Sequence, residues 1–245
     1  MAQVHARKDK IITGITKGVE FLFKKNKIDW IKGTARLAGQ GKVEIVDGDK
    51  QTLDARDIII ATGSEPRSVP GITIDRTRII TSDEAIHLKQ VPKSLVIMGS
   101  GAVGVEFASI FRRFGSEVTI LELLPRLVPV EDEAVSAELE KSFRKQGIKA
   151  LTGTKVTKAV AGANGVDIEA QTPDGKTSKM KADRLLVATG RGPVTSGVGA
   201  EDAGLAMDRG YIRVDREYKT SVPGISAIGD VITLGTPGHP QLAHG

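Results

Sequence analysis

The chain has 245 residues, of which 40% are hydrophobic and 27% charged, and it contains 28 glycines. This composition is typical of a globular α/β protein with a buried core. The net charge of +5 comes from 35 basic and 30 acidic residues. Acidic and basic residues are interspersed and no recognition motif accompanies the basic ones, so we expect no nucleic-acid partner. No apolar run is long enough to span a membrane and no signal peptide is present, so we expect a cytoplasmic protein.

The first 66 residues predict a helix, a β-meander and a buried strand. Apolar residues at helical spacing predict an amphipathic helix around residues 9–26 that packs on a sheet. Turn-forming residues then separate three predicted strands, which cover residues 29–37, 42–46 and 51–55. The apolar run at residues 58–60 predicts a strand that is buried on both faces of a parallel sheet.

Residues 67–91 are predicted to cross between two domains. Pro66, Pro70 and Gly71 interrupt regular structure. A helix is expected to begin at Thr81, because Glu84 follows three residues later and the two can form a capping box.

A βαβ unit is predicted next. Residues 95–98 form an apolar strand that leads into a glycine-rich turn, and the following helix carries apolar residues that we expect on one face: Val103, Phe107, Ile110, Phe111 and Phe114. Gly115 is expected to end this helix, and residues 117–122 form the second strand.

A second helix with Val135, Leu139 and Phe143 is expected to stop at Gly147, before a short strand at 149–151. A second meander follows, with strands at 155–160, 166–171 and 178–182 and a tight turn at Pro173-Asp174-Gly175. After a glycine-rich loop, residues 211–215 alternate as a strand.

Residues 52–63 align without a gap on residues 179–190, an offset of 127 positions (190 − 63), and both copies end in Ala-Thr-Gly. This is an internal repeat. The glycine turn that opens the second copy has no counterpart in the first, where it would fall before Met1, so we expect the chain to begin inside its first domain. The predicted fold is α/β, with two Rossmann-like three-layer domains that contain β-meanders, the first domain being incomplete. Its parts are residues 1–66 (the incomplete first domain), 67–91 (crossing), 92–192 (the second domain) and 193–245 (return segment to the first domain).

The glycine turn is a candidate dinucleotide site, made of Gly99, Ser100, Gly101, Ala102, Val103 and Gly104. Gly99 permits the tight turn, Gly101 lets a pyrophosphate approach the backbone, and Gly104 lets helix and strand pack closely. The alternative is a plain strand-to-helix turn with incidental glycines.

Glu122 ends the second strand, 18 positions after the third glycine (122 − 104). A carboxylate there can accept hydrogen bonds from both adenosine-ribose hydroxyls and would repel the extra phosphate of NADP, so we expect NAD. No arginine follows Glu122 to bind a 2′-phosphate. The alternative is an exposed charge at a strand end.

Asp230 directly follows an apolar strand and a glycine, where an aspartate can accept a hydrogen bond from a polyol. With the repeat, these features resemble the flavoprotein disulfide reductases, and most closely the dihydrolipoyl dehydrogenase family. The resemblance extends over nearly the whole chain and is most specific at residues 21–27, 58–66, 103–107, 122–127 and 241–244.

The resemblance implies two cofactors, FAD and NAD. FAD would contact Gly33, Thr62, Gly63, Ser64, Asp230, Gln241, Leu242, Ala243 and His244. NAD would contact the glycine turn from Gly99 to Gly104, and also Val105, Glu106, Glu122, Val156 and Gly190. Gln241 stands where the family commonly has Met, which affects a side-chain contact and not a backbone one.

The family's redox-active cysteine pair would lie before Met1, and its His–Glu catalytic pair would lie in a dimerisation domain after Gly245. The present chain has no cysteine, so we expect no thiolate chemistry and no catalytic residue in it, and no activity from this part alone. We also expect no metal site. The intact enzyme would be a homodimer that transfers electrons from dihydrolipoyl groups of 2-oxoacid dehydrogenase or glycine cleavage complexes through FAD to NAD. The alternatives are a stand-alone NAD-binding module without catalysis, or a mercuric, glutathione or related reductase of the same family.

Overall fold

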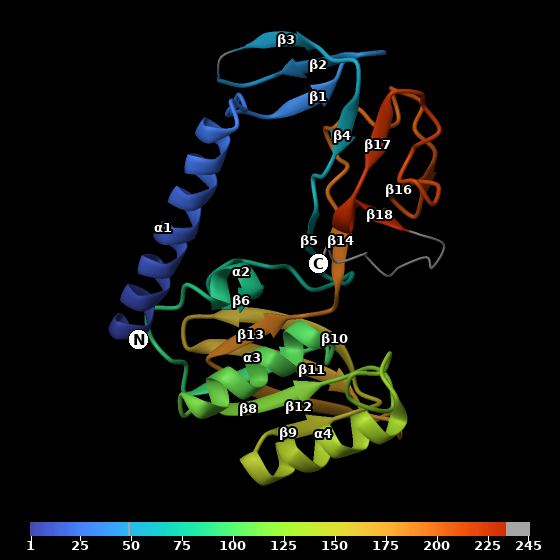
Figure 1. The fold of residues 1–245 in the computed structure, drawn as a ribbon. Helices are drawn as coiled ribbons and strands as arrows, with labels where there is room; N and C mark the ends of the chain where they lie inside the picture. The colour runs from blue at the N-terminus through green and yellow to red at the C-terminus, as the bar shows by residue number, and fades with distance from the viewer. Residues whose placement is uncertain (49, 234–245) are drawn as a thin grey trace. The chain divides into compact units, whose positions relative to one another are not determined.

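The computed structural model describes residues 1–48 and 50–233 (Figure 1). These residues fall into two compact units. One contains Met1–Ile11 and Pro66–Gly190, and the other contains Ile12–Glu65 and the chain from Arg191 onward. The polypeptide therefore leaves the second unit near residue 65 and returns to it near residue 191. No helix of the described residues has the length and apolar character needed to cross a bilayer.

The unit that holds residues 66–190 is built on a five-stranded parallel sheet. Its strands lie in the order β6 (Ile79–Ile80), β13 (Arg184–Val187), β7 (Ser94–Met98), β8 (Glu117–Leu121) and β9 (Lys149–Leu151). The neighbours β7 and β8 are joined by helix α3 (Ala102–Arg113), which confirms the predicted βαβ unit. Helix α4 (Glu133–Gln146) then leads into β9 and ends at Gly147, whose φ of 74° is left-handed, as the sequence predicted.

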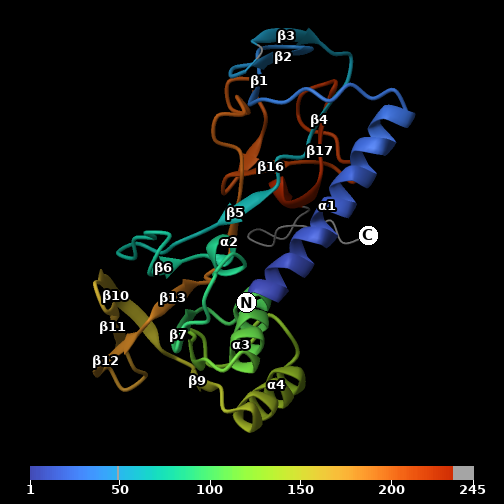
Figure 2. The ribbon, with the colours of Figure 1, turned by 90° about the vertical axis from the view of Figure 1, so that its left-hand side faces the viewer.

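Alternate residues of β7 point to opposite faces of this sheet, and each face has its own core. Leu95 and Ile97 pack in a cluster with α3 and α4. Val96 and Met98 pack in a second cluster with the antiparallel meander β10 (Lys155–Gly162), β11 (Gly165–Gln171) and β12 (Thr177–Ala182). Figure 2 shows the resulting three layers, with helices on one side of the parallel sheet and the meander on the other. The three-layer prediction is thus confirmed for this unit.

The second unit contains the first meander and several short strands. The meander strands β1 (Ala35–Leu37), β2 (Lys42–Ile45) and β3 (Gln51–Asp54) pair antiparallel in chain order. Strand β4 (Ile58–Ile60) pairs in parallel with β17 (Ile225–Ala227). A core cluster around Ile60, Ile212 and Ile232 joins this pair to the sheet of β15 (Met207–Asp208), β16 (Tyr211–Arg213) and β18 (Ile232–Thr233).

Two expectations about burial are wrong. Helix α1 (Ala2–Lys25) begins earlier than predicted and none of its side chains is buried among the described residues, so it does not pack on a sheet there. Strand β4 is covered on one face only among the described residues, because Ile60 is 4% exposed and Ile59 is 65% exposed.

The apolar residues that we expected on one face of α3 include neighbouring rings: Phe111 contacts both Phe107 and Phe114. Phe111 is buried together with Gly104 and Ala108, while Ile110 and Phe114 are 44% and 41% exposed. Within the described part of the chain, the core therefore covers part of this apolar face.

Strand β5 (Ser64–Pro66) pairs with β14 (Arg191–Pro193) where the chain passes between the units. Each of these strands directly follows an Ala-Thr-Gly end of the repeat. The sequence did not predict this pairing.

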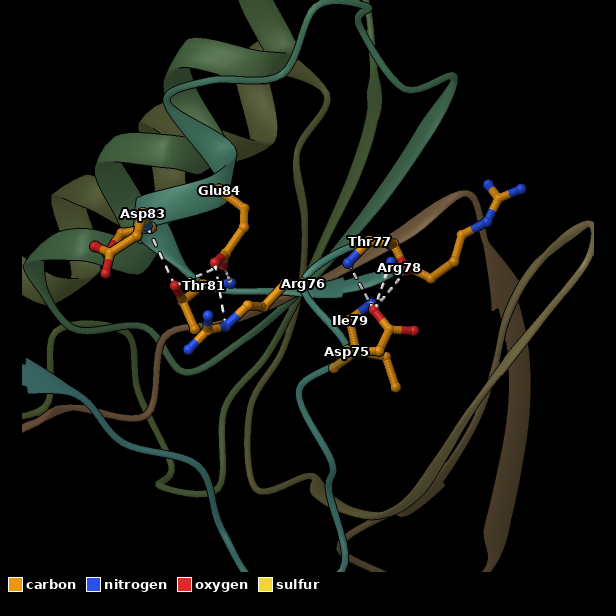
Figure 3. A network of polar contacts seen from close by, with 9 residues as sticks. Asp75, Arg76, Thr77, Arg78, Ile79, Thr81, Asp83 and Glu84 are labelled. Carbon is orange, nitrogen blue, oxygen red and sulfur yellow. Dashed lines mark hydrogen bonds and ion pairs between the residues drawn. The ribbon is translucent and has the colours of Figure 1, made fainter.

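Figure 3 shows the polar contacts on both sides of β6. Thr81 caps helix α2 (Ser82–Ala85): its backbone N–H and hydroxyl donate to Glu84 Oε2 at 2.9 and 2.8 Å, and its hydroxyl accepts from Asp83 N. The predicted capping box is therefore confirmed. Partial burial pushes the pKa of Glu84 upward, but the hydrogen bonds from Thr81 outweigh it and hold that pKa below its usual range.

Asp75 shapes the turn before β6 in the same way (Figure 3). Its Oδ1 accepts hydrogen bonds from the backbone N–H groups of Thr77, Arg78 and Ile79 at 2.7 to 2.9 Å. Burial raises the pKa of Asp75 and these hydrogen bonds lower it, with a net lowering. The network fixes the segment through which the chain enters the parallel sheet.

Candidate nucleotide-binding site

The glycine turn between β7 and α3 leaves no room for side chains at two positions and open space at a third. A Cβ on Gly99, whose φ is +102°, would lie 2.3 Å from the carbonyl oxygen of Ala188. A Cβ on Gly104 would lie 2.2 Å from the carbonyl oxygen of Gly99. At Gly101 a Cβ would meet nothing within 4 Å. The turn therefore packs tightly on its strand side and leaves its outer side accessible.

Helix α3 begins at the open side of this turn. Gly101 is its N-cap residue and provides no side-chain cap. The first N–H groups of an α-helix, here those of Ala102, Val103 and Gly104, have no partner within the helix and point along its axis. Together with the helix dipole, they form a favourable place for a phosphate group.

Glu122 lies beneath the same turn and is 7% exposed. Its Oε2 accepts hydrogen bonds from Ser100 N at 2.8 Å and from Ser100 Oγ at 2.7 Å. Its Oε1 accepts one from Leu124 N at 2.8 Å. The alternative of an exposed strand-end charge is therefore wrong, because the carboxylate is buried against the glycine turn.

The loop after β8 completes this region, and no sequence pattern indicated its conformation. Val128 has a left-handed φ of 41°, which is rare for a β-branched residue, and its N–H donates to Ser100 O at 3.1 Å. Leu127 is fully buried, whereas Leu123 and Leu124 are 60% and 47% exposed. The loop thus contacts the glycine turn through the Val128–Ser100 hydrogen bond, and two partly exposed apolar side chains, Leu123 and Leu124, follow Glu122.

The remaining residues expected near NAD are in the same unit. Glu106 is exposed on α3, and Val105 is half-buried in the helix-side core. Val156 is 8% exposed, and its side chain packs in the meander-side core. Gly190 follows β13 and accepts a hydrogen bond from Arg67 N at 3.0 Å.

A second polar cluster lies in the other unit, among residues expected near FAD. Ser64 Oγ donates to Asp230 Oδ2 at 2.6 Å, and Arg191 Nε donates to Ser64 Oγ at 2.7 Å. Thr62 Oγ1 donates to Val194 O at 2.6 Å, and Gly63 O accepts from Val194 N at 2.9 Å. The sequence reasoning missed Arg191, although it directly follows the second Ala-Thr-Gly.

Gly33 lies at the start of the first meander, where a Cβ would come within 2.7 Å of Ile45 Cγ2. Among the described residues, no hydrogen bond connects Gly33 to the Ser64 cluster. Gln241, Leu242, Ala243 and His244 lie outside the described residues.

These features define a protein with two related nucleotide-binding folds, of which one carries a glycine turn, a bare helix N-terminus and a buried acidic residue. The sequence profile of the pyridine nucleotide-disulphide oxidoreductases matches residues 1–245. The chain belongs to this family, whose members use FAD and NAD.

Curated relatives agree with this assignment. Dihydrolipoyl dehydrogenase 3 of Pseudomonas putida is 48% identical over the whole chain, which covers 52% of that protein. A dihydrolipoamide dehydrogenase of Chaetomium thermophilum is 41% identical, again over the whole chain and 48% of that protein. The chain thus spans about half the length of the curated relatives it matches.

Solved structures of flavoprotein reductases show the same fold. LpdA from Mycobacterium tuberculosis superposes with a TM-score of 0.84 at 29% identity, over 95% of this chain and 52% of that one. A Cu(II) complex of the flavoprotein disulfide reductase RclA from Escherichia coli gives a TM-score of 0.85 at 30% identity, over 92% and 51%. The expected fold class is confirmed by these comparisons.

Proposed function

We propose that the chain is the central part of a dihydrolipoyl dehydrogenase and that its glycine turn binds NAD. The observation that carries this proposal is the buried Glu122 carboxylate beneath a bare helix N-terminus. The names of the relatives support the enzyme class, and the family supports the two cofactors. In the intact enzyme, electrons would pass from dihydrolipoyl groups through FAD to NAD.

In this proposal residues 92–192 form the NAD-binding domain. The N–H groups at the start of α3 stabilise the pyrophosphate, and the open space at Gly101 lets it approach the backbone. Glu122 accepts a hydrogen bond from the adenosine ribose, with Leu123 and Leu124 beside it. Val105, Glu106, Val156 and Gly190 remain proposed contacts of the same cofactor. NAD, when bound, supplies the hydride acceptor.

Residues 1–66 and 193–245 are proposed as part of an FAD-binding domain, joined to the NAD-binding domain by residues 67–91. Asp230 would accept a hydrogen bond from the ribitol of FAD, and Ser64 would hold its carboxylate in place. Thr62, Gly63, Gly33 and residues 241–244 are the other proposed FAD contacts.

The partners follow from the same enzyme class. They would be dihydrolipoyl groups of 2-oxoacid dehydrogenase or glycine cleavage complexes, with a homodimer as the assembled form and the cytoplasm as its location. A stand-alone NAD-binding module is the second candidate, which the lack of any cysteine would favour if these 245 residues were the whole product. A coding sequence upstream of Met1 that contains a Cys-x-x-x-x-Cys segment in frame would decide for the enzyme.

The cofactor assignment is tested by Glu122→Ala. Hydrogen bonds to a charged group contribute about 1.5–3 kcal/mol, so this variant is expected to bind NADH about 10- to 100-fold more weakly. Fluorescence titration of the 245-residue chain with NADH measures the change. Glu117→Ala is the matched control, because Glu117 is an exposed carboxylate at the opposite end of the same strand. Equal NADH affinity in Glu122→Ala and the native chain, or tighter binding of NADPH than NADH, would reject the assignment.

A further inference from the structure

Ser100 occupies a position of the glycine turn at which the motif specifies no residue type. It is nevertheless completely buried. All three of its polar groups are hydrogen-bonded: N–H and Oγ–H donate to Glu122 Oε2, and its carbonyl oxygen accepts from Val128 N. The side chain therefore has a specific partner, which is the residue proposed to select the cofactor.

The hydrogen bonds to Glu122 limit what that carboxylate can do. A carboxylate offers about four lone-pair directions, two on each oxygen. On Oε2 both are taken by the two donors of Ser100, and on Oε1 one is taken by Leu124 N. One direction on Oε1 remains, so Glu122 can accept about one further strong hydrogen bond, from a single ribose hydroxyl. The earlier expectation was that it would accept from both.

We propose that Ser100 is a positioning residue for cofactor selection. Its hydroxyl holds the Glu122 carboxylate in one orientation, in which Oε1 is directed to the ribose of NADH. In the same orientation the fixed negative charge repels the 2′-phosphate of NADPH. This inference rests on the proposed NAD-binding role of Glu122. Without the hydroxyl, Oε2 keeps one donor in a buried place, and the carboxylate can reorient. NADH would then lose a well-placed acceptor, and NADPH would meet less fixed repulsion.

The test is a double-mutant cycle with Ser100→Ala, Glu122→Gln and the variant that carries both changes, in the full 245-residue chain. NADH and NADPH are titrated against each protein. We expect Ser100→Ala to weaken NADH binding about fivefold and to lower the preference for NADH over NADPH by a similar factor. In the Glu122→Gln background the same change is expected to alter NADH affinity less than about twofold, because the carboxylate it orients is gone.

Ser116→Ala is the matched control. Ser116 is also fully buried, and its Oγ donates to Pro92 O at 2.6 Å, but it precedes β8 at the end opposite to Glu122. It should lower the thermal stability about as much as Ser100→Ala without changing the NADH preference, which separates positioning from a merely structural effect. If Ser100→Ala folds poorly, Ser100→Gly also removes the hydroxyl and can replace it in the NADH and NADPH titrations.

Three outcomes overturn the inference, and the third is distinguishable from the first two. If Glu122→Gln weakens NADH binding but Ser100→Ala does not, or if Ser100→Ala has the same effect in both backgrounds, Ser100 does not act through Glu122. If Glu122→Gln leaves NADH affinity unchanged, the proposed cofactor role of Glu122 itself fails, and the role of Ser100 fails with it.

Discussion

The two copies of the internal repeat place the same strand in different surroundings. Ile59 and Leu186 occupy equivalent positions, 127 residues apart (186 − 59), in strands that both run into Ala-Thr-Gly. Leu186 is 0% exposed, because β13 lies between β6 and β7 and is covered by helices. Ile59 is 65% exposed, because β4 pairs only with β17 among the described residues. The shared sequence thus predicts a β-strand in both copies, whereas the elements packed around each strand decide how much its side chains contribute to stability.

The largest expected difference between the repeats follows from this burial. Leu186→Ala removes a side chain from the core and is expected to lower the free energy of unfolding by about 2–5 kcal/mol. Ile59→Ala removes a largely exposed side chain and is expected to change it by less than about 0.5 kcal/mol in the same chain. Urea unfolding followed by circular dichroism measures both.

Equal losses for the two variants would contradict the comparison, since they would show that the outer face of β4 is covered in solution. Leu185→Ala provides a further control, because Leu185 is also 0% exposed but faces the meander-side core. It should cost as much as Leu186→Ala.

Much of this architecture could be predicted from local patterns, and the exceptions share a cause. The glycine turn, the Thr81 capping box and the stop at Gly147 depend on residues close in sequence, and the structure contains all three. The left-handed backbone at Val128 and the contact of Arg191 with Ser64 depend on partners distant in sequence, so no local pattern could indicate them. The exposure of α1 escaped prediction for a related reason. Helical spacing identifies an apolar stripe but not what covers it.

At their ends, the two copies of the repeat make equivalent hydrogen bonds. Thr62 Oγ1 donates to Val194 O at 2.6 Å, and Thr189 Oγ1 donates to Arg67 O at 2.8 Å. Both threonines and both acceptors are 127 positions apart (189 − 62 and 194 − 67). The backbone bonds of Val194 N to Gly63 O and of Arg67 N to Gly190 O repeat the same relation. Here the copies have kept equivalent surroundings.

Thr62→Val and Thr189→Val should therefore have matching, moderate effects. Each removes one hydroxyl hydrogen bond while the side-chain shape is kept, so each is expected to lower the free energy of unfolding by about 0.5–1.5 kcal/mol. The same urea experiment measures them. A difference larger than about 1 kcal/mol between the two variants would show that the hydrogen bonds are equivalent only in geometry.

The smallest expected effects concern Asp47 and Asp174, again 127 positions apart (174 − 47), in the loops between the second and third strands of each meander. A hydrogen bond from the Thr34 side chain holds the pKa of Asp47 below its usual value. Hydrogen bonds from Lys176 and Thr172 lower the pKa of Asp174. A lowered folded-state pKa stabilises the fold above the unfolded-state pKa of about 3.9, and this contribution is lost as the pH falls through the folded-state value.

Asp47→Asn and Asp174→Asn are therefore each expected to lower the melting temperature slightly near neutral pH, with the difference from the native chain shrinking as the pH falls below about 4. Both carboxylates are solvent-accessible, so high salt should reduce the effects further. Thermal melts over a pH series test this. A difference that stays constant down to the lowest pH would mean that the charge of the aspartate is not what stabilises the loop.

The hydrogen bond from Arg67 N to Gly190 O, at 3.0 Å, means that the two ends of the segment 67–190, which forms the three layers, are neighbours. A domain whose ends adjoin can be inserted into another chain without separating the flanking strands, and it tolerates circular permutation. Residues 67–190 thus have the geometry of a transplantable insert, which a short linker between 67 and 190 would close into a permuted domain.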